Sequence, residues 1–149
     1  MEEERFGCTL EDGLEDRRAE DRVNKSPSTR LTLDKIQLED RTKAFAIQII
    51  RFVANLPKSR IGHVLGYQLL KSGTSVGANY REANRAESRA DFAHKIGIVE
   101  KECSESLYWL ELCDESDIGD KVVRSQLLQE CGELLAIFTS IGKSTKART

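Results

Sequence analysis

The sequence predicts an all-α fold, an antiparallel up-down-up-down bundle of four helices. Apolar residues recur every three or four positions in four successive stretches, which is the spacing of one face of an α-helix. The connections between these stretches are short, and short connections make successive helices antiparallel neighbours. No stretch shows the alternation of a β-strand. We therefore expect residues 38–146 to form one four-helix bundle domain.

The first helix is predicted from about Asp40 to Asn55. Pro57 should end it, because a proline drives the residue before it out of the α-helical conformation. The periodic apolar positions, which should face the core together, are Phe45, Ala46, Ile49, Ile50, Val53 and Leu56.

The second helix is predicted to run to about Ala83, with Ser59 as its N-cap. It is rich in small residues, and each glycine inside a helix costs about 1 kcal/mol relative to alanine. This composition predicts that a neighbouring backbone packs closely against the helix, as in small-xxx-small contacts. Its stripe is Ile61, Val64, Leu65, Leu69, Ser72, Val76, Asn79 and Ala83.

The third helix should begin at a capping box formed by Ser88 and Asp91 and should run to about Cys113. The residues from Asp114 to Gly119 are expected to form a polar turn. The stripe of this helix alternates spacings of four and three, which makes a heptad seam. Its members are Phe92, Ile96, Val99, Cys103, Ser106, Leu110 and Cys113.

The fourth helix is predicted to start near Asp117 or Asp120 and to end near Ile141, with Gly142 as its stop. The lysines and the arginine that follow suit the negative end of a helix. Its stripe is Val123, Leu127, Cys131, Leu134, Phe138 and Ile141.

Residues 1–37 are predicted to form a charged flexible tail, disordered or frayed. The segment lacks a sustained apolar stripe, and the cluster Ser26-Pro27-Ser28-Thr29 contains helix-breaking residues. Residues 1–38 carry ten acidic and seven basic side chains, and the whole chain has a net charge of −2. This balance excludes nucleic-acid binding by bulk charge, so any such contact needs a local basic patch.

The four cysteines are Cys8, Cys103, Cys113 and Cys131, and no C-x-x-C motif occurs. We expect free thiols in a reducing compartment and no zinc site. The sequence shows neither a secretory signal nor a stretch long enough to span a membrane, so we expect a cytoplasmic protein. No phosphate loop, nucleophile elbow or di-iron motif is present, and no metal, cofactor or small-molecule substrate is expected.

The segment from Leu69 to Leu112 holds two motifs that carry a resemblance. One is a serine-rich stretch before Ala78-Asn79-x-x-Glu82, and the other is Glu105-x-x-x-Trp109-Leu110-Glu111-Leu112. Together with the block Ser88-Arg-Ala-Asp-Phe-Ala-His-Lys-Ile, they resemble the bacterial four-helix-bundle family of 23S rRNA intervening-sequence proteins. The resemblance covers about residues 38–146.

The resemblance implies a non-enzymatic protein that forms a homo-oligomer, with a pentamer as the expected state. Family members are encoded inside insertions in 23S ribosomal RNA genes, and no catalytic activity defines them. A relative in fold, the accessory variability protein of diversity-generating retroelements, forms a five-fold barrel that binds reverse transcriptase and RNA. The expected partners are therefore other copies of this chain, and RNA or an RNA-associated protein.

Several polar and aromatic residues are candidates for a structural contact or an interface. Asn79 lies on the core stripe, where it either fixes register or subunit orientation, or is a half-exposed asparagine near the helix end. Glu102 and Glu105 lie on a second stripe with Ile98, Trp109 and Leu112, either an oligomer interface or the edge of a wide core. Their carboxylates should pair across helices or subunits, for example with Arg81, Arg85 or Lys71. Glu82 belongs to the Asn-x-x-Glu motif and is included with these structural candidates.

Arg81, Arg85 and Arg89 are candidates for contacts to nucleic-acid phosphates, with a solvated charged surface as the alternative. They are four residues apart, but a turn near Ala86 is expected to interrupt their common face. Arg89 and His94 also match the Arg-x-x-x-x-His pattern of HEPN-type ribonucleases, in which both residues act on RNA. The rival functions are thus a ribonuclease using Arg89 and His94, and a purely structural oligomer.

Overall fold

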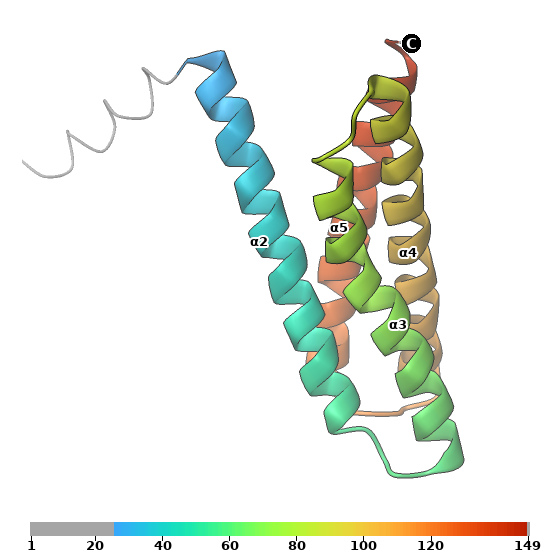
Figure 1. Ribbon diagram of the computed structural model, residues 1–149. Coiled ribbons are helices and arrows are strands. Elements are labelled where there is room, and N and C mark those ends of the chain that lie inside the picture. Colours follow the sequence, from blue (N-terminus) through green and yellow to red (C-terminus); the bar gives the residue numbers. More distant parts are fainter. Residues whose placement is uncertain (1–25, 149) are drawn as a thin grey trace, which may run out of the picture. The chain divides into compact units, whose positions relative to one another are not determined.

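The computed structural model describes residues 26–148, and all regular structure in that range is helical. Helix α2 spans Pro27–Ala54, α3 spans Arg60–Ala83, α4 spans Arg89–Glu115 and α5 spans Lys121–Lys146. The chain divides into two compact units, Met1–Asp34 and Lys35–Thr149. The second unit contains most of α2 and the other three helices, and successive helices in it run in opposite directions (Figure 1). This arrangement confirms the predicted all-α, up-down-up-down four-helix bundle.

Helix α2 begins at Pro27, earlier than the predicted start near Asp40. The cluster at residues 26–29 starts this helix, because the Ser26 hydroxyl accepts a hydrogen bond from the Thr29 N–H at 3.3 Å. Proline is well tolerated in the first helical turn, where its missing N–H has no helical partner. Within the predicted tail of residues 1–37, residues 27–37 are therefore helical, and residues 1–25 lie outside the described residues.

The other three helices start at the caps that the sequence indicates. The side chains of Ser59, Ser88 and Asp120 each accept a hydrogen bond from a backbone N–H three residues later. The capping box at α4 differs in one respect from its prediction. The Asp91 carboxylate accepts the N–H of Glu87, one residue before the cap, instead of that of Ser88.

Helix α5 continues to Lys146, so the predicted end near Ile141 is wrong. Gly142 does not stop the helix because it lacks the left-handed conformation of a C-terminal glycine. It is instead buried, and a Cβ atom on it would lie 3.7 Å from a methyl group of Ile96 in α4. Among the described glycines only Gly119, in the α4–α5 turn, has a positive φ, of 83°.

The core is made by one stripe of each helix, and most of the predicted stripe residues are confirmed as buried. Two further residues join the core through contacts that periodicity does not specify. The Phe52 ring packs on the α4–α5 turn at Gly119, and the Tyr80 ring packs edge-to-face on Phe138 with centroids 5.2 Å apart. The predicted core residues that are instead exposed are Ile50, Ile61 and Val64.

Helices α2 and α3 approach each other closely at two glycines of α3. A Cβ atom on Gly73 would lie 3.0 Å from two carbons of Ile49, and one on Gly77 would lie 3.3 Å from the hydroxyl of Thr42. Either added Cβ atom would be closer to its neighbour than ordinary van der Waals contact allows, so α2 lies against the bare backbone of α3 at these glycines. The predicted close approach of a neighbouring helix to the small residues of α3 is thereby confirmed.

A buried polar pair sets the register between α3 and α4. The hydroxyl oxygens of Ser72 and Ser106 are 2.9 Å apart, and both residues are almost completely buried. Each hydroxyl also lies within hydrogen-bond distance of a carbonyl in its own helix, that of Gln68 or Glu102. A shift of either helix would break the bond between the two hydroxyls and leave each with only the carbonyl of its own helix, so this polar pair favours the observed register.

Arg124 is an unpredicted buried charge that fixes the α4–α5 turn. Its side chain is 2% exposed, and its guanidinium donates to Asp114 at 3.1 Å, to Asp117 at 2.9 Å and to the carbonyl of Gly119 at 2.7 Å. Hydrogen bonding to Asp117 is the largest cause that raises the pKa of Arg124, and it keeps the group charged. One side chain therefore holds together the polar turn that the sequence predicted.

Three free thiols lie inside the core, as predicted for Cys103, Cys113 and Cys131. Cys8 lies outside the described residues. Burial raises the pKa of all three thiols, that of Cys131 from 9.0 to about 12. The Cys131 thiol also donates to the carbonyl of Cys103 at 3.4 Å, so it acts as a small polarisable core group between α5 and α4.

Replacement by alanine should change the free energy of unfolding in opposite directions at a glycine with open space around it and at a glycine packed against a neighbouring helix. Gly132→Ala should raise the free energy of unfolding by about 1 kcal/mol, because a Cβ there meets nothing within 4 Å and alanine is the better helix former. Gly73→Ala should lower it, because Ile49 must move. Urea denaturation of both variants checks this pair, and equal effects would contradict the α2–α3 packing.

The buried thiols should be unreactive in the folded protein. In a Cys8→Ser variant at pH 8, a thiol reagent should label Cys103, Cys113 and Cys131 only after denaturant is added, because burial disfavours their thiolates. Raised thiol pKa values mean that the folded state keeps protons that the unfolded state loses. The free energy of unfolding should therefore be highest below pH 9 and fall between about pH 9 and 12. Rapid labelling without denaturant would contradict this description of the core.

Candidate functional site

A second stripe on α4 runs beside its buried core stripe. Its members are all half-buried, and they are spaced four, three, four and three residues apart, which keeps them on one side of the helix. The core stripe next to it is fully buried from Ile96 to Cys113. The second stripe consists of Ile98, Glu102, Glu105, Trp109 and Leu112.

Helix α3 contributes the other side of this surface. Because Ser72 faces Ser106 and the helices are antiparallel, Asn79 lies near the level of Ile98, while Val64 lies near the level of Leu112. Val64 is 54% exposed. The term α3–α4 face is used below for the second stripe together with Val64, Asn79 and Glu82.

The two carboxylates of the second stripe have no ion-pair partner among the described residues. The pairing of Glu102 or Glu105 with Lys71, Arg81 or Arg85 is therefore absent within one chain, at residues 26–148. Glu105 instead accepts a hydrogen bond from the indole N–H of Trp109 at 3.4 Å. An ion pair between subunits stays a prediction.

Trp109 is held at the surface by its own helix. Its ring makes an edge-to-face contact with Tyr108, with centroids 5.1 Å apart, and Tyr108 is 53% exposed. The pair presents two aromatic rings at one level of α4. Aromatic side chains with one polar atom are common at the centres of protein interfaces.

Asn79 and Glu82, the polar residues of the first motif, make no hydrogen bond or ion pair to another helix in the described part of the chain. The Asn79 amide donates to the carbonyl of Ser75 in its own helix at 2.8 Å, and the residue is half-buried. The Asn79 amide is thus bonded within α3, and its role in register or subunit orientation stays a prediction. Glu82 is exposed, and its charge helps to raise the pKa of Lys95, after the larger effect of the hydrogen bond to Asp91.

The three candidate arginines are exposed but do not form one row. Helix α3 ends at Ala83 and α4 begins at Arg89, so the expected interruption of their common face is present. The Arg81 Nε lies 3.9 Å from the Glu39 carboxylate of α2. Arg89 donates to the carbonyl of Arg148 at 3.0 Å near the end of α5. Arg85 has no hydrogen bond or ion pair from its side chain within the described residues.

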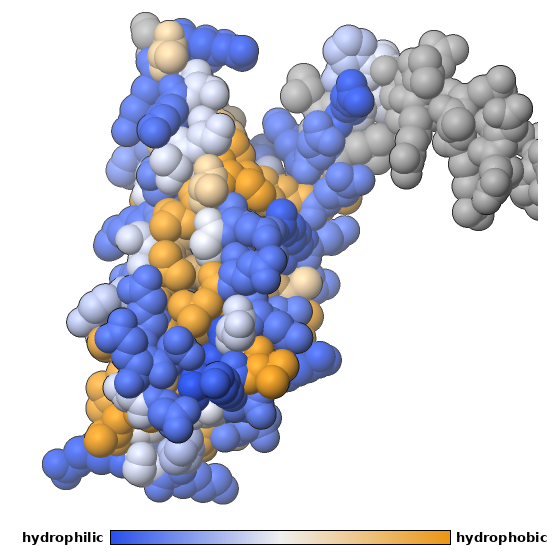
Figure 2. All heavy atoms as spheres, turned by 180° about the vertical axis from the view of Figure 1, so that it is seen from behind, coloured by the Kyte–Doolittle hydropathy of each residue, from blue (hydrophilic) through white to orange (hydrophobic). Residues whose placement is uncertain are grey.

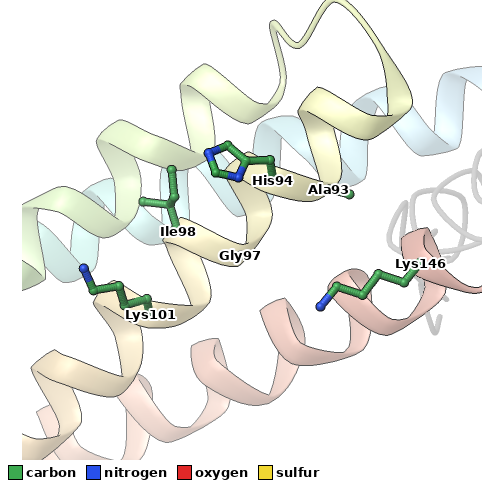
Figure 3. Close-up of a pocket in the computed structure, with 6 residues that line it drawn as sticks. All are labelled: Ala93, His94, Gly97, Ile98, Lys101 and Lys146. Atoms are coloured by element: carbon green, nitrogen blue, oxygen red, sulfur yellow. The ribbon is translucent and has the colours of Figure 1, made fainter.

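A depression of about 340 Å³ lies on α4 beside the end of α5. Figure 3 shows His94, Ile98 and Lys101 on one side of α4, and Lys146 extending from α5 along the space between the two helices. The sequence pattern indicates His94 as a candidate residue, but it does not indicate Lys101 or Lys146 as part of a site. The seven-residue spacing of His94 and Lys101, two helical turns, was the available signal. The lining residues are Ala93, His94, Gly97, Ile98, Lys101 and Lys146.

Arg89 and His94 do not converge as a catalytic pair within one chain. Five positions along a helix correspond to a rotation of about 140° and a rise of about 7.5 Å. The depression is lined by His94 and not by Arg89, whose guanidinium donates to the carbonyl of Arg148 just beyond α5. A ribonuclease arrangement would need Arg89 to leave that carbonyl.

Apolar groups extend beyond the α3–α4 face. Seen from behind, the molecule carries an apolar band along its helices, bordered by polar side chains (Figure 2). Leu107, Leu128 and Leu135 of α4 and α5 are half-buried in the same way as Trp109.

Within residues 26–148, no three potential metal-ligating side chains lie together. None of the described helices combines the length and apolarity required to cross a bilayer.

Comparison with known proteins agrees with the motifs on α3 and α4. The family model of the 23S rRNA-intervening sequence protein matches residues 34–140. A crystal structure of a protein of unknown function from the S23 ribosomal protein family of Bacteroides thetaiotaomicron is 36% identical, with a TM-score of 0.66, over 70% of this chain and 97% of that chain. No curated protein matches this chain. With most of its length matched by one family model, the chain belongs to the 23S rRNA-intervening sequence protein family.

Proposed function

We propose that this protein is a non-enzymatic helical bundle that self-associates through its α3–α4 face and holds RNA or an RNA-handling protein. Five copies are the expected number. A cytoplasmic location is part of the proposal, because three unpaired core thiols suit a reducing compartment.

The observation that carries the proposal is the half-buried second stripe of α4. A heptad stripe of this kind is the pattern by which helices pack, yet its side chains remain partly in water in one chain. A second copy would complete the burial of Trp109 and Leu112. Apolar side chains that are removed from water contribute about 25 cal/mol per Å².

Charge supports the same face. Glu102 and Glu105 lie among apolar side chains, so their further burial needs basic partners. Lys71 and Arg85 are exposed on the neighbouring part of the chain. We propose that residues of this kind from another copy supply the partners.

RNA as a partner is supported by the family and by basic residues at the connection between α3 and α4. The family is named for sequences that intervene in 23S rRNA, and RNA binding in such a protein would use local positive charge. The separation of Arg89 from His94 favours holding RNA over cutting it. The arginines Arg81, Arg85 and Arg89 are the proposed contributors to this contact.

Light scattering on the purified chain tests self-association. We expect a mass several times 16.8 kDa for the unaltered protein and a shift to the monomer for Leu112→Glu, because a carboxylate replaces a contact of the second stripe. Val122→Glu is the matched control, since Val122 is 64% exposed on α5 and lies away from this face.

Two results would contradict the proposed face. One is a mass of 16.8 kDa for the unaltered chain at every concentration. The other is an unchanged oligomer in Leu112→Glu while the circular dichroism of the variant remains helical. Loss of the oligomer in the Val122→Glu control would instead point to the outer surface of α5.

A further inference from the structure

The depression beside the end of α5 is basic. His94 and Lys101 come from α4 and Lys146 comes from the last residue of α5. The lining contains no carboxylate. Lys143, in the last turn of α5, adds another positive charge nearby.

Two of the acidic side chains near in sequence already have partners, whereas Glu102 and Glu105 belong to the second stripe and form no ion pair among the described residues. The Asp91 carboxylate bonds Lys95 at 2.9 Å, and the Glu100 carboxylate accepts the hydroxyl of Thr139 at 2.8 Å. Neither His94 nor Lys101 has a hydrogen bond or ion pair from its side chain among the described residues. The charge of Lys101 is therefore not cancelled by an ion pair among the described residues.

The base of the depression is open down to the backbone. A Cβ atom on Gly97 would meet nothing within 4 Å, so no contact with residues 26–148 explains a glycine in the middle of α4. Ala93, one turn earlier, is also small. Together these two residues leave room between His94 and Lys101 on one side and Lys146 on the other (Figure 3).

We propose that this depression binds the phosphate of a nucleotide, with the ammonium groups of Lys101 and Lys146 at the phosphate and the His94 ring against the base. Its volume of about 340 Å³ is large enough for one small ligand and too small for a folded domain. Lysines bind phosphate as point charges, and exposed aromatic and histidine rings stack on unpaired bases. The inference deepens the RNA part of the proposed function and rests on it.

The same chemistry would accept a nucleotide of single-stranded RNA or a free nucleotide. A labelled short single-stranded RNA, AMP and inorganic phosphate, titrated separately into the full chain, distinguish these sources. We expect RNA to bind most tightly, because neighbouring phosphates reach Lys143 and Arg89. Fluorescence anisotropy for RNA and calorimetry for the two small anions measure the affinities.

The variant Lys101→Gln/Lys146→Gln should weaken RNA binding at least about tenfold, since two phosphate contacts are lost. The slope of log K against log salt should fall by about 0.7 for each contact. Lys43→Gln/Lys58→Gln removes the same charge from exposed positions elsewhere and should leave binding within about twofold. His94→Ala should weaken binding of RNA and AMP but leave that of inorganic phosphate unchanged.

Equal losses in the two double variants would overturn the inference, because binding would then follow net charge alone. Absence of binding of all three probes to the unaltered chain would also overturn it. Cleavage of the RNA that His94→Ala abolishes would replace it with the ribonuclease alternative. Self-association is measured by light scattering, so its failure is distinguishable from failure of this site.

Discussion

The complete burial of one stripe of α4 is the constraint on which the rest of the bundle depends. From Ile96 to Cys113 this stripe is closed to solvent, and helices on both sides pack against it. The pair Ser72–Ser106 fixes α3 against it, and Cys131 bonds its backbone from α5. These contacts between buried polar groups favour the observed register of α4 against each neighbour.

This constraint also determines what lies at the surface. Once the core stripe of α4 is directed inward, the residues that directly precede its members in the sequence lie at the edge of the bundle. There they are half-buried. Trp109 and Leu112 thus form a second seam, with Glu102 and Glu105 among them. The same rotation places His94 and Lys101 on the outer side of α4, where the end of α5 brings Lys146 beside them. One helix therefore carries both the proposed contact between copies and the proposed nucleotide site.

Helix α2 is held to this assembly by shape and by charge. The glycines at positions 73 and 77 let its backbone approach α3, and Arg41 binds the carboxylates of Glu130 and Glu133 on α5. Hydrogen bonding to Glu130 is the largest cause of the raised pKa of Arg41. In the α4–α5 turn, the buried Arg124 guanidinium donates to the carbonyl of Gly119 and so holds the turn in place. The bundle thus combines an apolar interior with a few specific polar contacts between its elements.

The sequence by itself determined the helical class, the order and most limits of the helices, and the core stripe of α4. Spacing of apolar residues and local caps such as Ser59 and Ser88 are short-range properties that can be read along the chain. It did not determine the start of α2, where Pro27 begins a helix, or the continuation of α5 through Gly142. Only the tertiary structure decided that Phe52 and Arg124 are buried, that Ile61 is exposed, and that Lys146 lies beside Lys101. These outcomes depend on which helices pack together and on how far each is shifted along its axis relative to the others. The spacing of apolar residues in a single helix contains no information about either.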